Sequence, residues 1–307
     1  MSTRSLKVRR GKNRRLDNSS LALLLWPYII LFAIFIAIPV GVAMGLSFTY
    51  FNSVEEPRFN GLLNYIYMLT QDDVFIRYII PNTLTFAIVV GPVSYVVQFL
   101  LAWELAHIQK LPRTVLALIF YSPSMTGGVI MSVIWKVMFS GDQYGYLNSL
   151  LMQAGFIAQP IQWLTDPRFL MPIMLIVSVW SSMGVGFLSM LSGILNVDPQ
   201  LYEAGYVDGV SSRYQEIMYI TIPAMKPQML FGAIMSIVNA FSAGQIGVDL
   251  SGANPTPQYA GQTMITHISD YGFIQYNMGY ASALSIILMI TMFLASRVAE
   301  YMFGSDD

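Results

Sequence analysis

The amino-acid sequence predicts an all-α membrane protein with six transmembrane helices and with both termini in the cytoplasm. Composition is the first observation behind this prediction, because 55% of the 307 residues are hydrophobic and only 11% are charged, whereas soluble domains carry about a quarter charged residues. The second observation is a set of six long apolar segments. The third is the uneven distribution of basic residues around those segments.

Each apolar segment is long enough to cross a bilayer, which takes about 20 predominantly apolar residues in a helix. The segments run over residues 21–48, 82–106, 114–138, 170–195, 228–249 and 279–303. The strands of a membrane barrel would be shorter and would alternate strictly, so helices are favoured. The first segment exceeds the length of a signal-peptide core and lacks a convincing A-x-A site, which indicates a retained span.

The basic residues predict the orientation. Residues 1–15 hold seven bases and no acid, and such a cluster before an apolar run more often sets membrane orientation than binds nucleic acid. With the N-terminus inside, the inner set has twelve bases: those seven, Lys110, Arg113, Arg213, Lys226 and Arg297. The outer set has four: Arg58, Arg77, Lys136 and Arg168. We therefore expect a cytoplasmic segment at 1–20 and one transmembrane domain at 21–305.

The sequence lacks the residues and motifs that several kinds of chemistry require. There are no cysteines, and His107 and His267 show no metal-binding spacing. The chain has no G-x-x-x-x-G-K-[ST] loop, so we expect no ATPase site of its own. A nucleophile motif is also missing, which argues against a membrane enzyme. We expect no catalytic residue, no metal and no bound cofactor.

One long polar segment interrupts the apolar sequence at residues 196–227, on the predicted cytoplasmic side. Asp198 followed by Pro199 is a helix start, and Gly209 is a natural residue to follow a helix end. Ser212 and Gln215 match a capping box, which predicts a second helix. That helix should stop before Pro223 because residues preceding proline avoid the α region. The first helix carries only acids, which suits a protein partner better than an anionic membrane surface.

The motifs in this segment resemble a known family. Glu203-Ala204-Gly205, Asp208-Gly209, Ile220-Thr221-Ile222-Pro223 and Pro227 look like the EAA loop of binding-protein-dependent ABC importer permeases. Further matches resemble the carbohydrate (maltose-type) branch: Asn82-Thr83, Pro123, Trp135, Phe139, "GYLN" at 145–148, "LTDP" at 164–167 and Trp180. The resemblance covers about residues 80–300. Three departures are Gly205 and Val210, where the family has alanine, and one extra residue between Asp208 and Pro223.

The resemblance implies a type I (MetI-like) permease fold and a set of partners. The family's EAA loop docks on a cytoplasmic ATPase, so the implied coupling residues are Glu203, Ala204, Gly205, Asp208, Gly209 and Pro223. ATP and magnesium would be bound by two partner ATPase subunits. A second homologous permease, as a heterodimer partner, and an extracytoplasmic solute-binding protein complete the implied assembly. Its location would be the bacterial or archaeal cell (inner) membrane, in contact with lipid.

Polar side chains inside the third to fifth spans are candidates for a sugar pathway. They are Tyr121, Ser122, Trp180, Ser181, Ser182, Asn239, Ser242 and Gln245. Polar residues in spans more often join helices than touch a substrate. A non-sugar cargo (a polyamine, an amino acid or an oxyanion) stays open as an alternative. A stand-alone secondary carrier is less favoured, because such carriers typically need a carboxylate at the membrane midplane.

Overall fold

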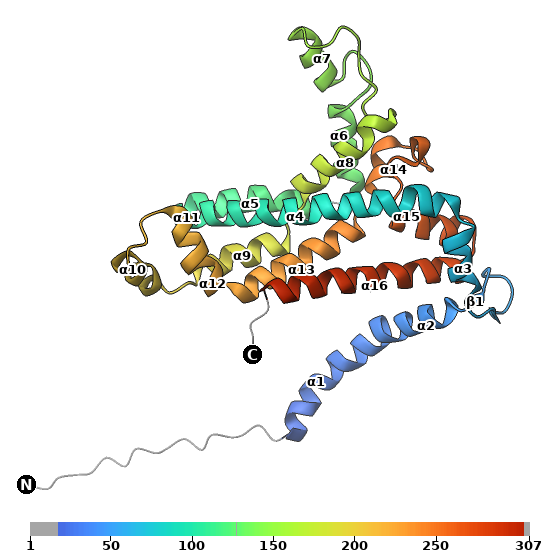
Figure 1. Cartoon of the computed structure of the whole chain (residues 1–307), viewed down its shortest axis with the longest axis horizontal. Helices are drawn as coiled ribbons and strands as arrows, with labels where there is room; N and C mark the ends of the chain where they lie inside the picture. Colours follow the sequence, from blue (N-terminus) through green and yellow to red (C-terminus); the bar gives the residue numbers. More distant parts are fainter. Residues whose placement is uncertain (1–17, 127, 304–307) are drawn as a thin grey trace, which may run out of the picture. The chain divides into compact units, whose positions relative to one another are not determined.

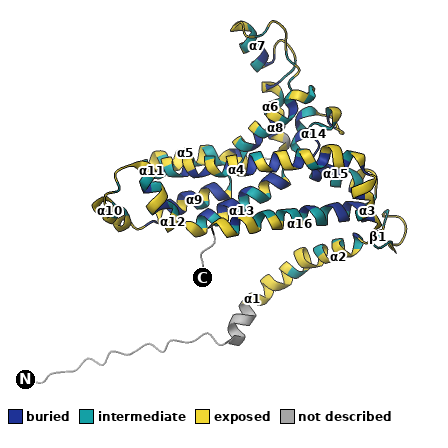
Figure 2. Ribbon diagram, in the orientation of Figure 1, coloured by how far each residue is buried: buried dark blue, intermediate teal, exposed yellow. Residues whose placement is uncertain are grey.

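The computed structural model describes residues 18–126 and 128–303. Most of the basic segment expected at 1–20 therefore lies outside the described residues. The chain divides into two units, Met1–Gly45 and Leu46–Asp307. In the first, α1 (Asn18–Phe32), the π turn η1 (Ala33–Ala37) and α2 (Ile38–Leu46) follow one another. They supply an apolar helical stretch, Leu25–Leu46, in which none of the residues of η1 and α2 is buried (Figure 2).

The second unit begins with a short hairpin and continues as helices. Strand β1 (Thr49–Tyr50) pairs antiparallel with β2 (Arg58–Phe59). The helices up to the middle of the chain are α3 (Leu63–Thr70), η2 (Phe75–Ile79), α4 (Ile80–Ala106), α5 (Lys110–Met125), α6 (Gly128–Met138), α7 (Tyr146–Gln153), α8 (Pro167–Ser181) and α9 (Val185–Leu195). Those that follow are α10 (Pro199–Val207), α11 (Arg213–Glu216), η3 (Ile217–Thr221), α12 (Ile222–Ala224), α13 (Lys226–Ser242), α14 (Ile246–Ser251), η4 (Pro257–Tyr259), α15 (Met264–Ser269), η5 (Asp270–Ile274) and α16 (Met278–Phe303).

Helices α4, α9, α13 and α16 lie side by side and form a bundle (Figure 1). Small residues allow close contact: a Cβ on Gly232 of α13 would overlap Met190 of α9, and a Cβ on Gly91 of α4 would lie 3.8 Å from the Ala240 Cβ. Helices α10–α12 lie at one end of the bundle, together with the C-terminal end of α16, and α3 and α15 lie at the other end (Figure 1).

Helix continuity is where the structure differs from the sequence-based expectation. Three described helices, Leu25–Leu46, Phe75–Ala106 and Met278–Met302, are long and apolar enough to cross a membrane, and up to five spans result if two bent pairs count as one span each. The expected third span is α5 and α6, whose axes differ by 99°, and the expected fourth is α8 and α9, bent by 43°. The expected fifth span divides at Ala243–Gln245 into α13 and α14.

Local backbone conformation explains these breaks. Thr126 after α5 is extended, Gly184 between α8 and α9 has φ −100° and ψ −143°, and Ala243 after α13 has ψ 64°. None of these conformations continues an α-helix. Apolar composition alone does not reveal such breaks, because both halves of each broken span are hydrophobic.

A buried polar cluster holds the end of the bundle that carries α3 and α15. The Asp72 side chain accepts hydrogen bonds from the Phe75 N–H (2.8 Å), the Tyr280 hydroxyl (2.8 Å) and His267 Nε2 (2.9 Å). Asp72, His267 and Tyr280 are all at most 5% exposed. Since these residues lie before α4, in α15 and in α16, one carboxylate joins three parts of the chain that are far apart in sequence.

We expect Asp72→Asn to destabilise the folded protein by about 2 kcal/mol, the usual range for hydrogen bonds to a charged group. Burial raises the pKa of the Asp72 carboxyl, but the hydrogen bonds from His267, Phe75 and Tyr280 outweigh burial and leave it below its ordinary value of 3.8. A lowered carboxyl pKa stabilises the fold above pH 3.8, and this contribution is lost as the pH falls below that value.

Thermal unfolding of the purified protein in detergent checks this prediction. At neutral pH the Asn variant should unfold at a lower temperature, and the gap to wild type should close below pH 3.8. Asp73→Asn is the matched control, because Asp73 is exposed and pairs only across 3.6 Å with Arg77 at the surface. Equal midpoints for wild type and Asp72→Asn at neutral pH would contradict the stabilising role.

Candidate functional site

The polar segment at 196–227 folds largely as its sequence predicts. The Asp198 side chain accepts a hydrogen bond from the Gln200 N–H at 3.0 Å and so caps α10. The helix ends at Asp208, and Gly209 follows with φ +95°, a conformation that favours glycine. Both ends of the first helix are therefore confirmed.

The capping box of the second helix is confirmed as well. The Ser212 Oγ accepts from the Gln215 N–H at 3.2 Å, and the Gln215 Oε1 accepts from the N–H groups of Ser212 (3.2 Å) and Ser211 (3.0 Å). Residues Gly209–Ser212 lie between α10 and α11 outside any helix. This elbow offers a place for the extra residue of the segment without a change in either helix.

The predicted stop before Pro223 is wrong. The chain stays helical through α11, η3 and α12 and turns out of the helix at Met225. Pro223 has no N–H to donate, and the residues before it form a π turn in which the Ile222 N–H reaches the Ile217 carbonyl. The wider turn carries the helix past the proline, which the α-helical rule does not foresee.

The first helix of the segment presents an exposed surface at the end of the bundle. Glu203, Ala204, Asp208, Gly209 and Pro223 are all exposed, and Gly205 is half-buried. The segment also exposes several large apolar side chains, of which Leu201, Tyr206 and Val207 are in α10 and Tyr214, Met218 and Tyr219 are in α11 and η3. An apolar patch of this kind on a polar loop is typical of a protein-binding surface.

A neighbouring side chain explains why position 205 carries a glycine. A Cβ at this position would overlap the Ile220 Cδ1 of η3, so a larger residue there would require the Ile220 side chain to shift. The Tyr202 hydroxyl lies 3.2 Å from the Thr221 Oγ1 on the same contact. The helix-weakening effect of glycine is thus accompanied by closer packing of the two helices.

Two adjoining polar cavities, of about 310 and 240 Å³, lie where the broken helices meet. Both are lined by Ser124, Ser181, Ala243 and Ile246. Of the residues selected from the sequence, Ser181 lines both cavities, Ser182 and Asn239 line the smaller one, and Ser242 and Gln245 line the larger one. The structure therefore brings together five of the eight candidates.

The smaller cavity contains polar atoms that the sequence analysis missed. Ser94, Gln98, Ser178 and Ser236 line it, and a side-chain oxygen of each is fully buried in the surrounding packing without a hydrogen-bond partner among the described residues. Unpartnered buried polar groups are costly and call for an explanation. Ser94 and Gln98 are four residues apart and so share one face of α4, a signal that was available in the sequence.

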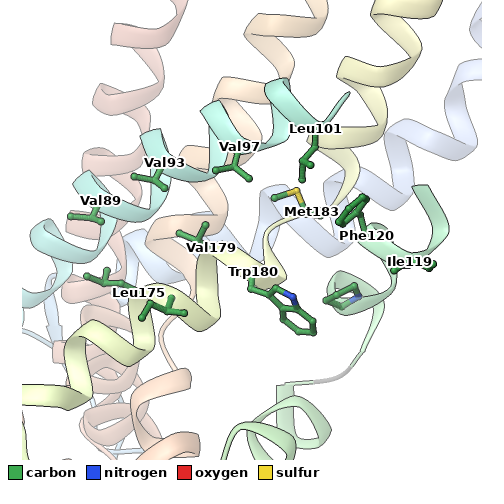
Figure 3. A pocket seen from close by; sticks show the side chains of 12 residues that line it. Val89, Val93, Val97, Leu101, Ile119, Phe120, Leu175, Val179, Trp180 and Met183 are labelled. Atoms are coloured by element: carbon green, nitrogen blue, oxygen red, sulfur yellow. The ribbon is translucent and has the colours of Figure 1, made fainter. Parts of the chain in front are cut away.

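The remaining candidates lie elsewhere. Trp180 lines a separate apolar cavity of about 570 Å³ between α4, α5 and α8, where Phe120 and Met183 also lie (Figure 3). The Ser122 hydroxyl donates to the Ile119 carbonyl of its own helix at 2.9 Å. Neither Tyr121 nor Ser122 is among the described residues that line these three cavities.

The charge at the polar cavities is low. Among the described residues that line them, Asp249 is the one charged side chain, and none is a lysine, an arginine or a histidine. Serine hydroxyls, the Thr126 hydroxyl and the amides of Gln98, Asn239 and Gln245 supply the other polar side-chain groups. This arrangement can donate and accept hydrogen bonds, and the nearest basic group known to act on it is Lys136, which interacts electrostatically with Asp249 without lining either cavity.

Comparison with known proteins gives one consistent picture, although no family model matches the chain. The chain is 28% identical over 292 residues to the probable ABC transporter permease protein YesP of Bacillus subtilis, covering 95% of this chain and 92% of the relative. It is 26% identical over 283 residues to the arabinooligosaccharides transport system permease protein AraP of the same organism, covering 91% and 87%.

Two solved structures have the same fold. A chain of a bacterial ABC transporter involved in the import of the acidic polysaccharide alginate superposes with a TM-score of 0.75 at 25% identity, covering 93% of this chain and 95% of that one. A chain of a bacterial alginate transporter in complex with an alginate pentasaccharide-bound periplasmic protein gives 0.74 at 24% identity, covering 94% and 96%. These likenesses extend over nearly the whole length of the proteins compared.

Proposed function

We infer that this chain, a homologue of the permease subunits of sugar ABC transporters, is the transmembrane permease subunit of an ATP-driven carbohydrate importer. The observation that carries this proposal is the smaller polar cavity. Its lining brings serine hydroxyls and the amides of Gln98 and Asn239 together inside an otherwise apolar bundle. Hydroxyl groups of a sugar can exchange hydrogen bonds with such groups, and a sugar needs no counter-charge.

The exposed surface of α10 is, in this proposal, the docking site for an ATPase subunit. It combines exposed Leu201, Tyr206 and Val207 with the acids Glu203 and Asp208 at one end of the bundle. Two such ATPase subunits would bind ATP and magnesium, and this chain would hydrolyse none. The chain would cross the membrane six times, with α10–α12 and both termini on the cytoplasmic side.

The further partners follow from the same proposal. A second, homologous permease would complete the pathway as a heterodimer partner, and an extracytoplasmic binding protein would deliver the sugar. The solved alginate transporter in complex with a periplasmic protein supports such a delivery step. The complex would be located in the bacterial or archaeal cell (inner) membrane.

The lining of the cavities bears on the alternative cargoes. An oxyanion would meet the Asp249 carboxylate and no basic side chain among the described lining residues. This disfavours oxyanions and, equally, acidic sugars such as the alginate imported by the structural neighbour. A neutral mono- or oligosaccharide fits the hydroxyl and amide groups best. A polyamine would find one carboxylate, too few for a cation with several charges.

Reconstitution tests the proposal. The chain, its partner permease, the ATPase subunits and the binding protein encoded with them are placed in liposomes, and ATP-dependent sugar uptake is measured after a ligand screen on the binding protein. Uptake should require ATP and every subunit. Uptake by this chain without any ATPase would show a stand-alone carrier and refute the proposal.

Asn239→Leu should lower sugar uptake about tenfold, which corresponds to ~1.4 kcal/mol, because the cavity loses an amide that can bond to the cargo. The variant keeps the side-chain size, so the complex should assemble normally. Ser285→Ala is the control: the Ser285 hydroxyl donates to the Ala281 carbonyl of its own helix at 2.9 Å, away from both cavities. Initial uptake rates in liposomes check the prediction, and an unchanged rate for Asn239→Leu would remove this residue from the pathway.

A further inference from the structure

The Glu216 carboxylate lies buried at a junction of the cytoplasmic segment and the bundle. Glu216, at the end of α11, is only 4% exposed. Its Oε2 accepts a hydrogen bond from the Tyr206 hydroxyl of α10 at 3.2 Å and lies 3.5 Å from the Arg213 guanidinium. Its Oε1 lies 3.7 Å from Nε2 of His107, the residue that ends α4. The carboxylate thus contacts α10 on one oxygen and α4 on the other.

Other contacts strengthen this junction. The His107 ring lies 4.4 Å from the Trp103 ring of α4, and its Nδ1 bonds to the Trp103 carbonyl at 2.8 Å. Because a carbonyl only accepts, Nδ1 carries a proton, and an ion pair through Nε2 then requires the doubly protonated ring. The Arg213 guanidinium also lies over the Trp103 ring at 5.6 Å.

Helix α4 connects the junction to the polar cavity. Gln98 and Ser94, which line the smaller cavity, lie nine and thirteen residues before His107 on the same helix. At 1.5 Å per residue the nearer of them is about 14 Å from the junction along the helix axis. Helices are among the rigid elements that carry coupling between two sites, so we expect a displacement of the α4 end at His107 to reach the cavity wall.

From these contacts we propose that Glu216 is a positioning residue that links the exposed helix α10 to α4 and thereby to the polar cavity. The proposal rests on the proposed function, in which an ATPase docks on α10. A movement of α10 reaches Glu216 through Tyr206 and reaches α4 through His107. A buried carboxylate is costly unless it is paired, so its three partners bind α10, α11 and α4 into one joint.

The experiment uses the chain's lack of cysteine. Ala243, which lines both polar cavities, is replaced by cysteine in the full complex with its partner permease and ATPase subunits in nanodiscs. The probe is the rate at which a small methanethiosulfonate reagent labels this cysteine, read on this chain by mass, with and without the magnesium complex of AMP-PNP. In the wild-type background the nucleotide should change the labelling rate by about fivefold or more, the lower end of usual coupling between two sites.

Three substitutions that preserve shape break the link. Glu216→Gln removes the charge, Tyr206→Phe removes the hydroxyl, and His107→Phe keeps the ring on Trp103 without its nitrogens. Each should bring the ratio of the labelling rates with and without nucleotide close to one while the complex keeps all of its subunits. Glu300→Gln is the matched control, because Glu300 pairs with Arg297 three residues away at 2.7 Å on an exposed part of α16. It should leave the nucleotide effect unchanged.

The combination of Tyr206→Phe with His107→Phe separates a link from two independent stabilising contacts. If both residues act through Glu216, the double variant should lose no more of the nucleotide effect than either single variant. A combined loss equal to the product of the single losses would overturn the proposal, and so would a full nucleotide effect in Glu216→Gln. If the wild-type complex shows no response to nucleotide, the proposed ATP-driven function fails, and the link fails with it.

Discussion

Gly209→Val is expected to reduce ATP-driven uptake about tenfold or more, equivalent to at least ~1.4 kcal/mol, while the transmembrane bundle remains folded. Gly209 has φ +95°, and no atom lies within 4 Å of the position its Cβ would take. The cost is therefore backbone strain, roughly 1–2 kcal/mol for an L-residue and more for a β-branched one. Relief of that strain would turn α10 away from its present direction, and the surface proposed to meet the ATPase would turn with it.

Uptake assays and co-purification of the ATPase subunits check this expectation. Gly155→Val is a close control, because Gly155 also has a positive φ, of +76°, and also has open space around it, but lies in the loop after α7. The two variants carry the same kind of strain in different places. Normal uptake by Gly209→Val, or an equal loss in both variants, would show that the direction of α10 does not matter for transport.

Gly247→Ala is expected to destabilise the folded protein by about 3 kcal/mol, the upper part of the usual range for overpacking. Gly247 in α14 faces Gly261 before α15, and a Cβ on Gly247 would overlap the Gly261 carbonyl oxygen. Backbone atoms cannot move aside as the end of a side chain can. The second half of the divided fifth span would have to shift, and it carries one wall of the larger polar cavity.

The thermal midpoint of the purified protein in detergent measures this effect. Gly91→Ala provides the comparison, since a Cβ there would meet only the Ala240 Cβ at an ordinary 3.8 Å. That variant should match or exceed the wild-type midpoint, because alanine favours a helix by about 1 kcal/mol over glycine. If Gly247→Ala were as stable as Gly91→Ala, the close backbone contact would not be important for the fold.

Features set by a few neighbouring residues were predictable from the sequence. The caps at Asp198 and Ser212 and the turn at Gly209 each depend on residues within one helical turn, and all three are present. The resemblance to importer permeases was also confirmed, since the relatives include a probable ABC transporter permease and an arabinooligosaccharide transport permease. The continuation of the helix through Pro223 was missed because it depends on a π turn, which has no simple sequence signature.

Features made by distant residues were not predictable. Asp72 and His267 are 195 residues apart and meet in a buried hydrogen bond. Glu216 reads in the sequence as one more acid of a cytoplasmic loop, and only its 4% exposure and its contacts distinguish it. Serine is a common residue in membrane helices, so the four unpartnered oxygens could be recognised only after α4, α8 and α13 had been placed around one cavity.

The breaks in three of the expected spans have an electrostatic consequence. Helices α5, α8 and α13 end at residues that border the polar cavities, and α6, α9 and α14 begin there. A helix end carries about half an elementary charge, positive at the N-terminus and negative at the C-terminus. Three ends of each sign largely cancel, yet each leaves main-chain N–H or C=O groups without intrahelical partners. Main-chain donors and acceptors of both directions therefore surround the polar cavities. Such a lining suits a polyhydroxylated molecule in more than one orientation and attracts ions only weakly.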